Sequence, residues 1–252
     1  MPDRNPVPGL VADLVEETAA LDALVGELDP DAWLRPTPAW QWDVRDTLAH
    51  LADTDEIAVD TCTGGARTLQ ACIDRSASAE DVTLAGVLRG RRVAGAAVLA
   101  WWRAARAREV EVLAGLEPSV RVPWGLGMSA PAFVTARLME TWAHALDVHA
   151  ALGSTPIDTD RLAHVAWLGV RSLPYACAVA GEPPPAVPLR VELDLPSGAT
   201  WSAGPDDAPA RIRGPAGAFC RVVTRRLPAA IAGLVAEGDE AVRLLRVARC
   251  YL

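Results

Sequence analysis

The feature that most constrains the fold of this chain is a long run from Met128 to Gly153 that carries strong signals for one helix. Ser129 followed by Pro131 is typical of a helix start, and Gly153 is typical of a helix end. No glycine and no further proline lies between Pro131 and Gly153. The run therefore predicts a single helix of about six turns, which is long enough to cross a small domain.

Four polar residues of this predicted helix lie on one face, because they recur at spacings of three and four. They are Arg137, Glu140, His144 and Asp147. Apolar residues flank this polar stripe on both sides, so the helix has apolar surface around most of its circumference. Such a stripe is expected to point into a helical bundle. The alternative is a solvated face on which the charges form salt bridges.

Glu140 and His144 are one helical turn apart, which places their Cβ atoms about 5–6 Å from each other. A carboxylate and an imidazole at this spacing can chelate one metal ion if a third ligand comes from another element. An acid four residues before a histidine also arises easily by chance in a chain with 32 acidic residues and four histidines. The spacing alone leaves both a metal site and a salt-bridged surface open.

Charge and composition argue against several classes of function. The net charge of −8 and the isoelectric point near 5.0 give no support to nucleic-acid binding. The longest apolar run, Val93–Trp102, is too short to span a bilayer, and the polar, proline-punctuated N-terminus shows no signal peptide. The five cysteines form no CxxC pair and fit buried thiols in a reducing cytosol. We therefore expect a soluble, cytoplasmic protein that binds neither nucleic acid nor a membrane.

The hydrophobic period divides the chain into two parts. Up to a proline-rich segment at 181–185, apolar residues recur every three or four positions, as in amphipathic helices. After it they alternate with charged residues, as in half-buried strands. The chain is therefore predicted to be mainly α, with a helical bundle at 1–182, a loop packed by tryptophans at 32–44, and a small α+β domain at 183–252. Helices are predicted at 8–28, 43–60, 83–116, 128–153, 158–179, 214–226 and 239–251, and strands at 189–195, 199–203 and 210–213.

Two segments together resemble a known family. Residues 42–51 (WDVRDTLAHL) and 135–148 (TARLMETWAHALDV) are similar to the DinB-like metal-binding proteins of actinobacteria. They resemble more closely the group related to mycothiol-dependent maleylpyruvate isomerase. Residues 123–125 (PWG) and 214–216 (GPA) also match this group, so the resemblance extends over nearly the whole chain.

The resemblance implies an N-terminal DinB-like four-helix bundle, followed by an appended C-terminal α+β domain. It also implies one divalent metal ion held by His50, Glu140 and His144, which match the ligand positions of the family. Zinc is the first expectation for this ion, and nickel and iron are alternatives, because two histidines and one carboxylate suit all three metals. Without the resemblance, His50 would be interpreted as a histidine at the edge of the core, bonded to Asp46 or Asp53.

Further residues are expected to support the metal ligands and the substrate. One of Asp46, Asp53 and Asp147 is expected to orient a ligand imidazole through a hydrogen bond. Asp147 comes first because it matches the family pattern, although a salt bridge on the helix surface would explain it equally well. Arg226 matches an arginine near the end of the family's C-terminal helix and is the candidate catalytic residue that contacts substrate carboxylates. Arg225 stands where the family usually has glycine, which leaves open whether Arg226, Arg225 or neither of them faces the site.

The resemblance implies a metal-dependent enzyme that uses mycothiol or a similar low-molecular-weight thiol on a small electrophile, as an isomerase or thiol transferase. Two imidazoles and one carboxylate leave coordination positions open, which is typical of a catalytic metal site. One alternative is a lyase, cyclase or hydrolase of specialised metabolism that uses metal-bound water without a thiol. Another is a non-catalytic member that binds a small ligand. The pattern leaves the substrate and the oligomeric state open.

Overall fold

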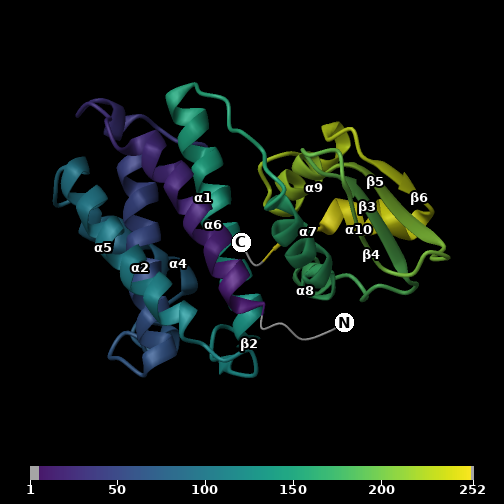
Figure 1. The fold of residues 1–252 in the computed structure, drawn as a ribbon, viewed down its shortest axis with the longest axis horizontal. Helices are drawn as coiled ribbons and strands as arrows, with labels where there is room; N and C mark the ends of the chain where they lie inside the picture. Colours follow the sequence, from purple (N-terminus) through teal and green to yellow (C-terminus); the bar gives the residue numbers. More distant parts are fainter. Residues whose placement is uncertain (1–5, 251–252) are drawn as a thin grey trace. The chain divides into compact units, whose positions relative to one another are not determined.

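The computed structural model describes residues 6–250, which form two compact units that divide between Pro156 and Ile157. The predicted class, mainly α with a small sheet region, is confirmed (Figure 1). Among the described residues, no helix has both the length and the apolar character needed to cross a membrane.

The helices of the first unit are α1 (Val7–Val25), α2 (Val44–Thr63), α3 (Leu69–Ile73), α4 (Ala79–Gly90), α5 (Gly95–Ala114) and α6 (Ala130–Leu152), with a 3-10 turn η1 (Ala32–Leu34) and the short strands β1 (Arg121–Val122) and β2 (Met128–Ser129).

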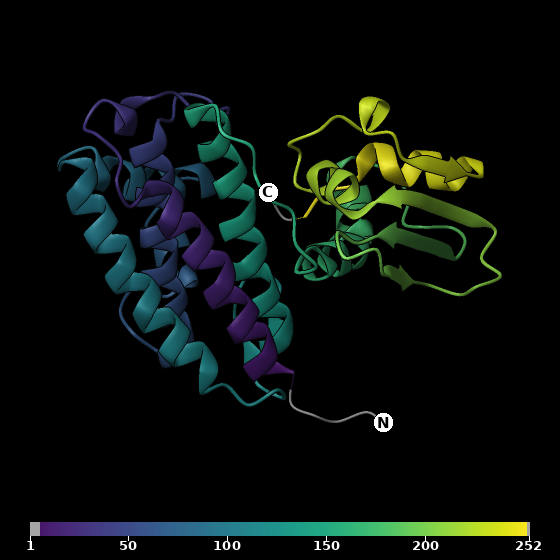
Figure 2. The ribbon, with the colours of Figure 1, turned by 45° about the horizontal axis from the view of Figure 1, so that its top comes forward.

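Helices α1, α2, α5 and α6 lie side by side and form a four-helix bundle (Figure 2). Their apolar faces meet in one core, and α4 packs against α2. Burying one large apolar side chain contributes roughly 1.5–3 kcal/mol, so this core is the main source of cohesion between the helices. Large buried members of the core are Leu21, Trp33, Leu48, Leu51, Trp102 and Val148.

Helix α6 is buried along most of its length. Every residue from Phe133 to Val148 is buried except Glu140, which is half-buried. The helix begins after Ser129, whose hydroxyl accepts a hydrogen bond from the Ala132 amide, and ends at Gly153 with φ 68°. The predicted bounds of this helix are thus confirmed. The solvated-face interpretation of its polar stripe is wrong, because the stripe is enclosed by the neighbouring helices.

The N-terminus of α2 is fixed by a reciprocal pair of hydrogen bonds. The Asp46 amide donates to the Asp43 carboxylate at 2.8 Å, and the Asp43 amide donates to the Asp46 carboxylate at 3.3 Å. This capping box confirms the predicted start of the helix. It sets the position of every side chain along α2, including His50.

The helix predicted at 83–116 is interrupted, and residues 91–94 separate α4 from α5. Two glycines flank the interruption and allow close approach of neighbouring elements. A Cβ on Gly95 would collide with the Trp33 indole, and a Cβ on Gly90 would collide with the Ala49 side chain. The interruption therefore lets the chain turn while both of its ends stay packed against the bundle.

The C-terminal unit is built around a four-stranded sheet with the order β4-β3-β5-β6. Strands β3 and β5 are parallel, and the other neighbouring strands are antiparallel. Strand β6 was not expected from the sequence, because its three residues are too few to show a period. The elements are α7 (Leu162–Arg171), α8 (Leu173–Val179), β3 (Leu189–Asp194), β4 (Thr200–Ala203), β5 (Ala210–Pro215), α9 (Ala216–Val223), a 3-10 turn η2 (Ala229–Ile231), β6 (Val235–Glu237) and α10 (Asp239–Val247).

The structure divides the chain earlier than the predicted boundary at residue 182. Helix α7 packs against α9, where Gly169 meets the Val223 side chain and the Cys220 thiol contacts the Leu162 carbonyl. The predicted helix at 158–179 is in fact two helices, because Pro174 cannot continue a helical hydrogen-bond ladder. The last helix ends at Val247, and residue 251 of its predicted range lies outside the described residues.

Candidate metal centre

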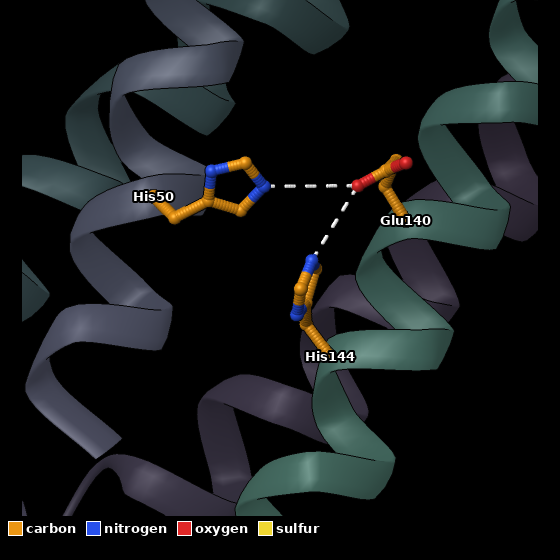
Figure 3. Close-up of side chains that lie close together, drawn as sticks. All are labelled: His50, Glu140 and His144. Carbon is orange, nitrogen blue, oxygen red and sulfur yellow. Dashed lines mark ion pairs between the residues drawn. The ribbon is translucent and has the colours of Figure 1, made fainter. Parts of the chain in front are cut away.

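Three side chains with metal-binding atoms converge inside the bundle (Figure 3). His50 comes from α2, and Glu140 and His144 come from α6. Glu140 Oε2 lies 3.8 Å from His50 Nε2 and 3.5 Å from His144 Nε2. All three ligand atoms lie within 4.8 Å of one another. The structure thus brings together the three residues that the sequence proposed as metal ligands.

The chemistry of this cluster fits a cation at its centre. Asp147 Oδ2 lies 3.2 Å from His144 Nδ1, and because a carboxylate only accepts, the proton of the imidazole belongs on Nδ1. His144 Nε2 and Glu140 Oε2 then turn lone pairs toward each other over 3.5 Å, which is longer than an ordinary hydrogen bond. Ligand atoms of a tetrahedral site with bonds of about 2.1 Å are roughly 3.4 Å apart. A metal ion therefore requires only small movements of these side chains.

The electrostatic environment favours the protonation states that bind metal. Burial lowers the pKa of His50 below its ordinary value, and the Glu140 carboxylate partly offsets this effect. Burial raises the pKa of Glu140, but the imidazoles of His144 and His50 donate to the carboxylate when their facing nitrogens carry a proton. This effect outweighs burial and holds the pKa of Glu140 well below its ordinary value. At neutral pH the cluster therefore offers neutral His50 and ionised Glu140, as metal binding requires.

The three aspartates that were considered as partners of the ligand imidazoles have different contacts. Asp147 accepts a hydrogen bond from His144, as was predicted first among the three. Asp46 instead pairs with Arg91, and Asp53 pairs with Arg67. His50 is therefore not the core-edge histidine bonded to Asp46 or Asp53 that the pattern alone suggested.

The remaining member of the polar stripe, Arg137, belongs to a buried network of two arginines and two acids. Its guanidinium donates to Asp55 Oδ1 at 2.7 Å and to Glu109 Oε1 at 2.8 Å. Arg106 completes the network with distances of 3.0 Å to Asp55 and 2.6 Å to Glu109. The network joins α2, α5 and α6 one turn away from Glu140. Sequence reasoning did not find Asp55, Arg106 or Glu109, because their pairing depends on the register between helices.

Asp55 is expected to make the stability of the protein depend on pH. Burial raises its pKa to about 7, against the lowering effect of Arg106 and Arg137. A carboxyl group whose pKa is higher in the folded than in the unfolded state stabilises the fold at low pH and loses that contribution as the pH rises. We expect the free energy of unfolding to contain a component that falls by about 2 kcal/mol between pH 5 and 7.

Asp55→Asn separates this component from those of the other titrating groups, because asparagine resembles the protonated acid at every pH. Urea unfolding at pH 5 and 7 is expected to show a smaller decrease in the variant than in the wild type. An identical decrease in both proteins would contradict the assignment to Asp55.

Trp42 is a residue of this site that the sequence pattern did not identify. Its indole centroid lies 5.2 Å from the His50 ring and 6.1 Å from the His144 ring. The sequence suggested only that tryptophans pack the loop at 32–44. The available signals were that Trp42 begins the segment 42–51 that resembles the family and that it lies immediately before the N-cap of the helix that carries His50.

Arg226, the candidate catalytic residue, lies in the C-terminal unit just after α9. It is half-buried, and its guanidinium donates to the Thr224 carbonyl at 2.6 Å. Arg225 beside it is exposed and has φ 63°, a left-handed conformation that favours glycine. The amides of Arg225 and Arg226 bond back to the carbonyls of Val222 and Arg221, as in a Schellman motif. The usual glycine of the family at position 225 therefore has a conformational explanation.

Arg225→Gly is expected to raise the free energy of unfolding by about 0.5–1 kcal/mol, because it removes the steric cost of a side chain in this conformation. Arg108→Gly is the matched control, since Arg108 is an exposed residue in the interior of α5, where glycine costs about 1 kcal/mol. Chemical denaturation of both variants checks the opposite signs. Destabilisation by both changes would refute the explanation.

Comparison with known proteins places these observations in a family. The family model described as the mycothiol maleylpyruvate isomerase N-terminal domain matches residues 14–149, more than half of the chain. Two relatives from strains of Mycobacterium tuberculosis, both described as uncharacterized proteins, are each 40% identical over 252 residues. The match covers 100% of this chain and 97% of each relative.

Two solved structures share the fold. They are crystal structures of mycothiol-dependent maleylpyruvate isomerase and of a mutant of that enzyme, with TM-scores of 0.61 and 0.62. Each match covers 92% of both chains at 16% sequence identity, which establishes a common fold. The match of the family model over 14–149, together with these full-length relatives, shows that the chain belongs to the mycothiol maleylpyruvate isomerase N-terminal domain family.

Proposed function

We propose that this protein is a metal-dependent enzyme that activates a mycothiol-type thiol for reaction with a small electrophile, as an isomerase or thiol transferase. The observation that carries the proposal is the convergence of His50 Nε2, His144 Nε2 and Glu140 Oε2 within 4.8 Å inside the bundle. A divalent metal, with zinc as the first candidate, lowers the pKa of a thiol or water and holds it as a nucleophile at neutral pH.

The residues of the chain have separate roles in this proposal. His50, Glu140 and His144 bind the metal and leave coordination positions open. Asp147 keeps the proton of His144 on Nδ1, so that the Nε2 lone pair faces the ligand cluster. Arg226 is proposed to bind a carboxylate of the substrate, because a guanidinium recognises carboxylates with two parallel hydrogen bonds.

Family membership supports a thiol as the second substrate. The structurally similar crystal structures are named for a mycothiol-dependent isomerase of maleylpyruvate, a small molecule. We extend to this chain only the reaction class, which is a thiol-dependent isomerisation or transfer on a small electrophile. We propose that the protein acts in the cytoplasm.

Titration of the cobalt-substituted protein with mycothiol tests the proposal. Thiol ligation is expected to shift the visible absorption of the cobalt saturably, because thiolate ligation changes the ligand field. The matched control is the cobalt protein with the S-methylated thiol, which offers no thiolate and should cause no shift. A wild-type spectrum that mycothiol leaves unchanged would contradict thiol chemistry and favour the water-dependent lyase, cyclase or hydrolase. Binding of small ligands without turnover of any electrophile would favour a non-catalytic role.

A further inference from the structure

The two ligand imidazoles are held in different ways. His144 donates its Nδ1 proton toward Asp147, which fixes both the tautomer and the ring orientation. His50 Nδ1 has no hydrogen-bond partner among residues 6–250, and His50 Nε2 lies 3.8 Å from Glu140 Oε2, too far for a hydrogen bond. No protein hydrogen bond among the described residues therefore fixes the orientation of the His50 ring through Nδ1.

The Trp42 indole is placed to fix this orientation. It contacts the His50 ring at a centroid distance of 5.2 Å with the planes at 47°, within the range of favourable aromatic pairs. It also lies 6.1 Å from the His144 ring, at an angle of 24°. The two imidazoles are 4.9 Å apart, so one indole borders both of them.

The backbone holds Trp42 firmly in this position. The Trp42 amide donates to the Ala39 carbonyl at 3.0 Å, and its carbonyl accepts from the Thr37 amide at 2.9 Å. The preceding residue, Gln41, has φ 63°, an unfavourable conformation for a residue with a side chain, and its carbonyl accepts from Arg91 at 2.8 Å.

Arg91 also connects this loop to the helix that carries His50. Its guanidinium forms a two-pronged pair with the buried Asp46 carboxylate, at 3.0 and 2.7 Å. Asp46 belongs to the capping box of α2. Arg91 therefore ties the loop to the start of α2, and this link sets the distance between Trp42 and His50.

We infer that Trp42 is the positioning residue of His50. Its packing fixes this ligand, as the hydrogen bond that His144 donates to Asp147 fixes His144. The inference rests on the proposed metal site. Partners that orient metal ligands typically contribute 10–100-fold to metal affinity. Loss of the flat indole face should let the His50 ring rotate away from Glu140 and weaken metal binding to a similar extent.

Trp42→Leu tests the inference, because leucine retains apolar volume but presents no flat face. Competition with a chromophoric chelator for zinc is expected to show about 10–100-fold weaker binding. Trp42→Phe should bind zinc within about threefold of the wild-type affinity, because phenylalanine keeps an aromatic face at this position. Trp40→Leu is the matched control and should bind as the wild type does, since Trp40 is 83% exposed on the same loop. Wild-type affinity in Trp42→Leu would overturn the inference.

Proton NMR of the metal-free protein gives a second readout that does not depend on metal binding. The rings of His50 and His144 are expected to show a nuclear Overhauser contact in the wild type and in Trp42→Phe. The contact should weaken in Trp42→Leu, whereas the signals of His149 and His164 should not change. An unchanged contact in Trp42→Leu would refute the role of Trp42. If the wild type binds no metal but the contact between His50 and His144 is still lost in Trp42→Leu, the proposed function is refuted and the positioning role of Trp42 is retained.

Discussion

Arg137→Met is expected to lower the free energy of unfolding by about 3–5 kcal/mol at pH 8, because it leaves a buried charge without its partner. In the wild type at this pH, Arg137 and Arg106 balance the carboxylates of Asp55 and Glu109, and all four side chains are buried. The variant leaves two acids facing one arginine. Urea denaturation of wild type and variant measures the difference.

The same variant should be less destabilised at pH 5. Burial raises the pKa of Asp55 to about 7, so this acid is protonated at pH 5 and Arg106 alone balances Glu109. Arg108→Met is the control: Arg108 lies on α5 beside Arg106 but is exposed, and its loss should change stability by less than about 0.5 kcal/mol. An effect of Arg137→Met as small as that of the control would contradict the buried network.

Glu140→Gln is expected to weaken the binding of zinc by about 100-fold or more. The change keeps the size of the side chain but replaces the only anionic ligand with a weakly binding amide oxygen. Asp147→Asn is expected to weaken zinc binding by about 10–100-fold, because Asp147 acts only through His144. The effect of Glu140→Gln should be larger. Isothermal titration calorimetry of the metal-free proteins gives both affinities.

Glu111→Gln provides a matched control, because Glu111 is an exposed acid whose only ion pair is to Arg108 among the described residues. Its metal affinity should equal that of the wild type. Equal affinity of wild type and Glu140→Gln would mean that the carboxylate is not a ligand.

The sequence was informative where local rules decide the structure. Ser129, Pro131 and Gly153 correctly predicted one helix, since caps and helix breakers act within a few residues. The apolar flanks correctly predicted that the polar stripe faces the interior. Glu140 and His144 were identified by their spacing, because one helical turn brings them together whatever surrounds the helix. His50 required the family resemblance, since no local rule brings α2 against α6.

Features that depend on the fit between distant elements were not predictable. The pairing of Arg137 with Asp55 and Glu109 requires the relative register of three helices, which hydrophobic period does not encode. The contact of Trp42 with the imidazoles likewise depends on how a loop folds back over α2. The boundary at residue 182 was placed too late, because a proline-rich loop is a conspicuous signal while the packing of α7 on α9 leaves none in the local pattern.

Metal content is the most direct test of the central claim, that His50, Glu140 and His144 form a metal site. Purified wild-type protein and His144→Ala are reconstituted with zinc, desalted and analysed by mass spectrometry. The account predicts about one equivalent of metal in the wild type and loss of that metal from His144→Ala, with the far-ultraviolet circular dichroism of the two proteins unchanged. A wild-type protein that remains free of metal after reconstitution with zinc, nickel and iron would contradict it.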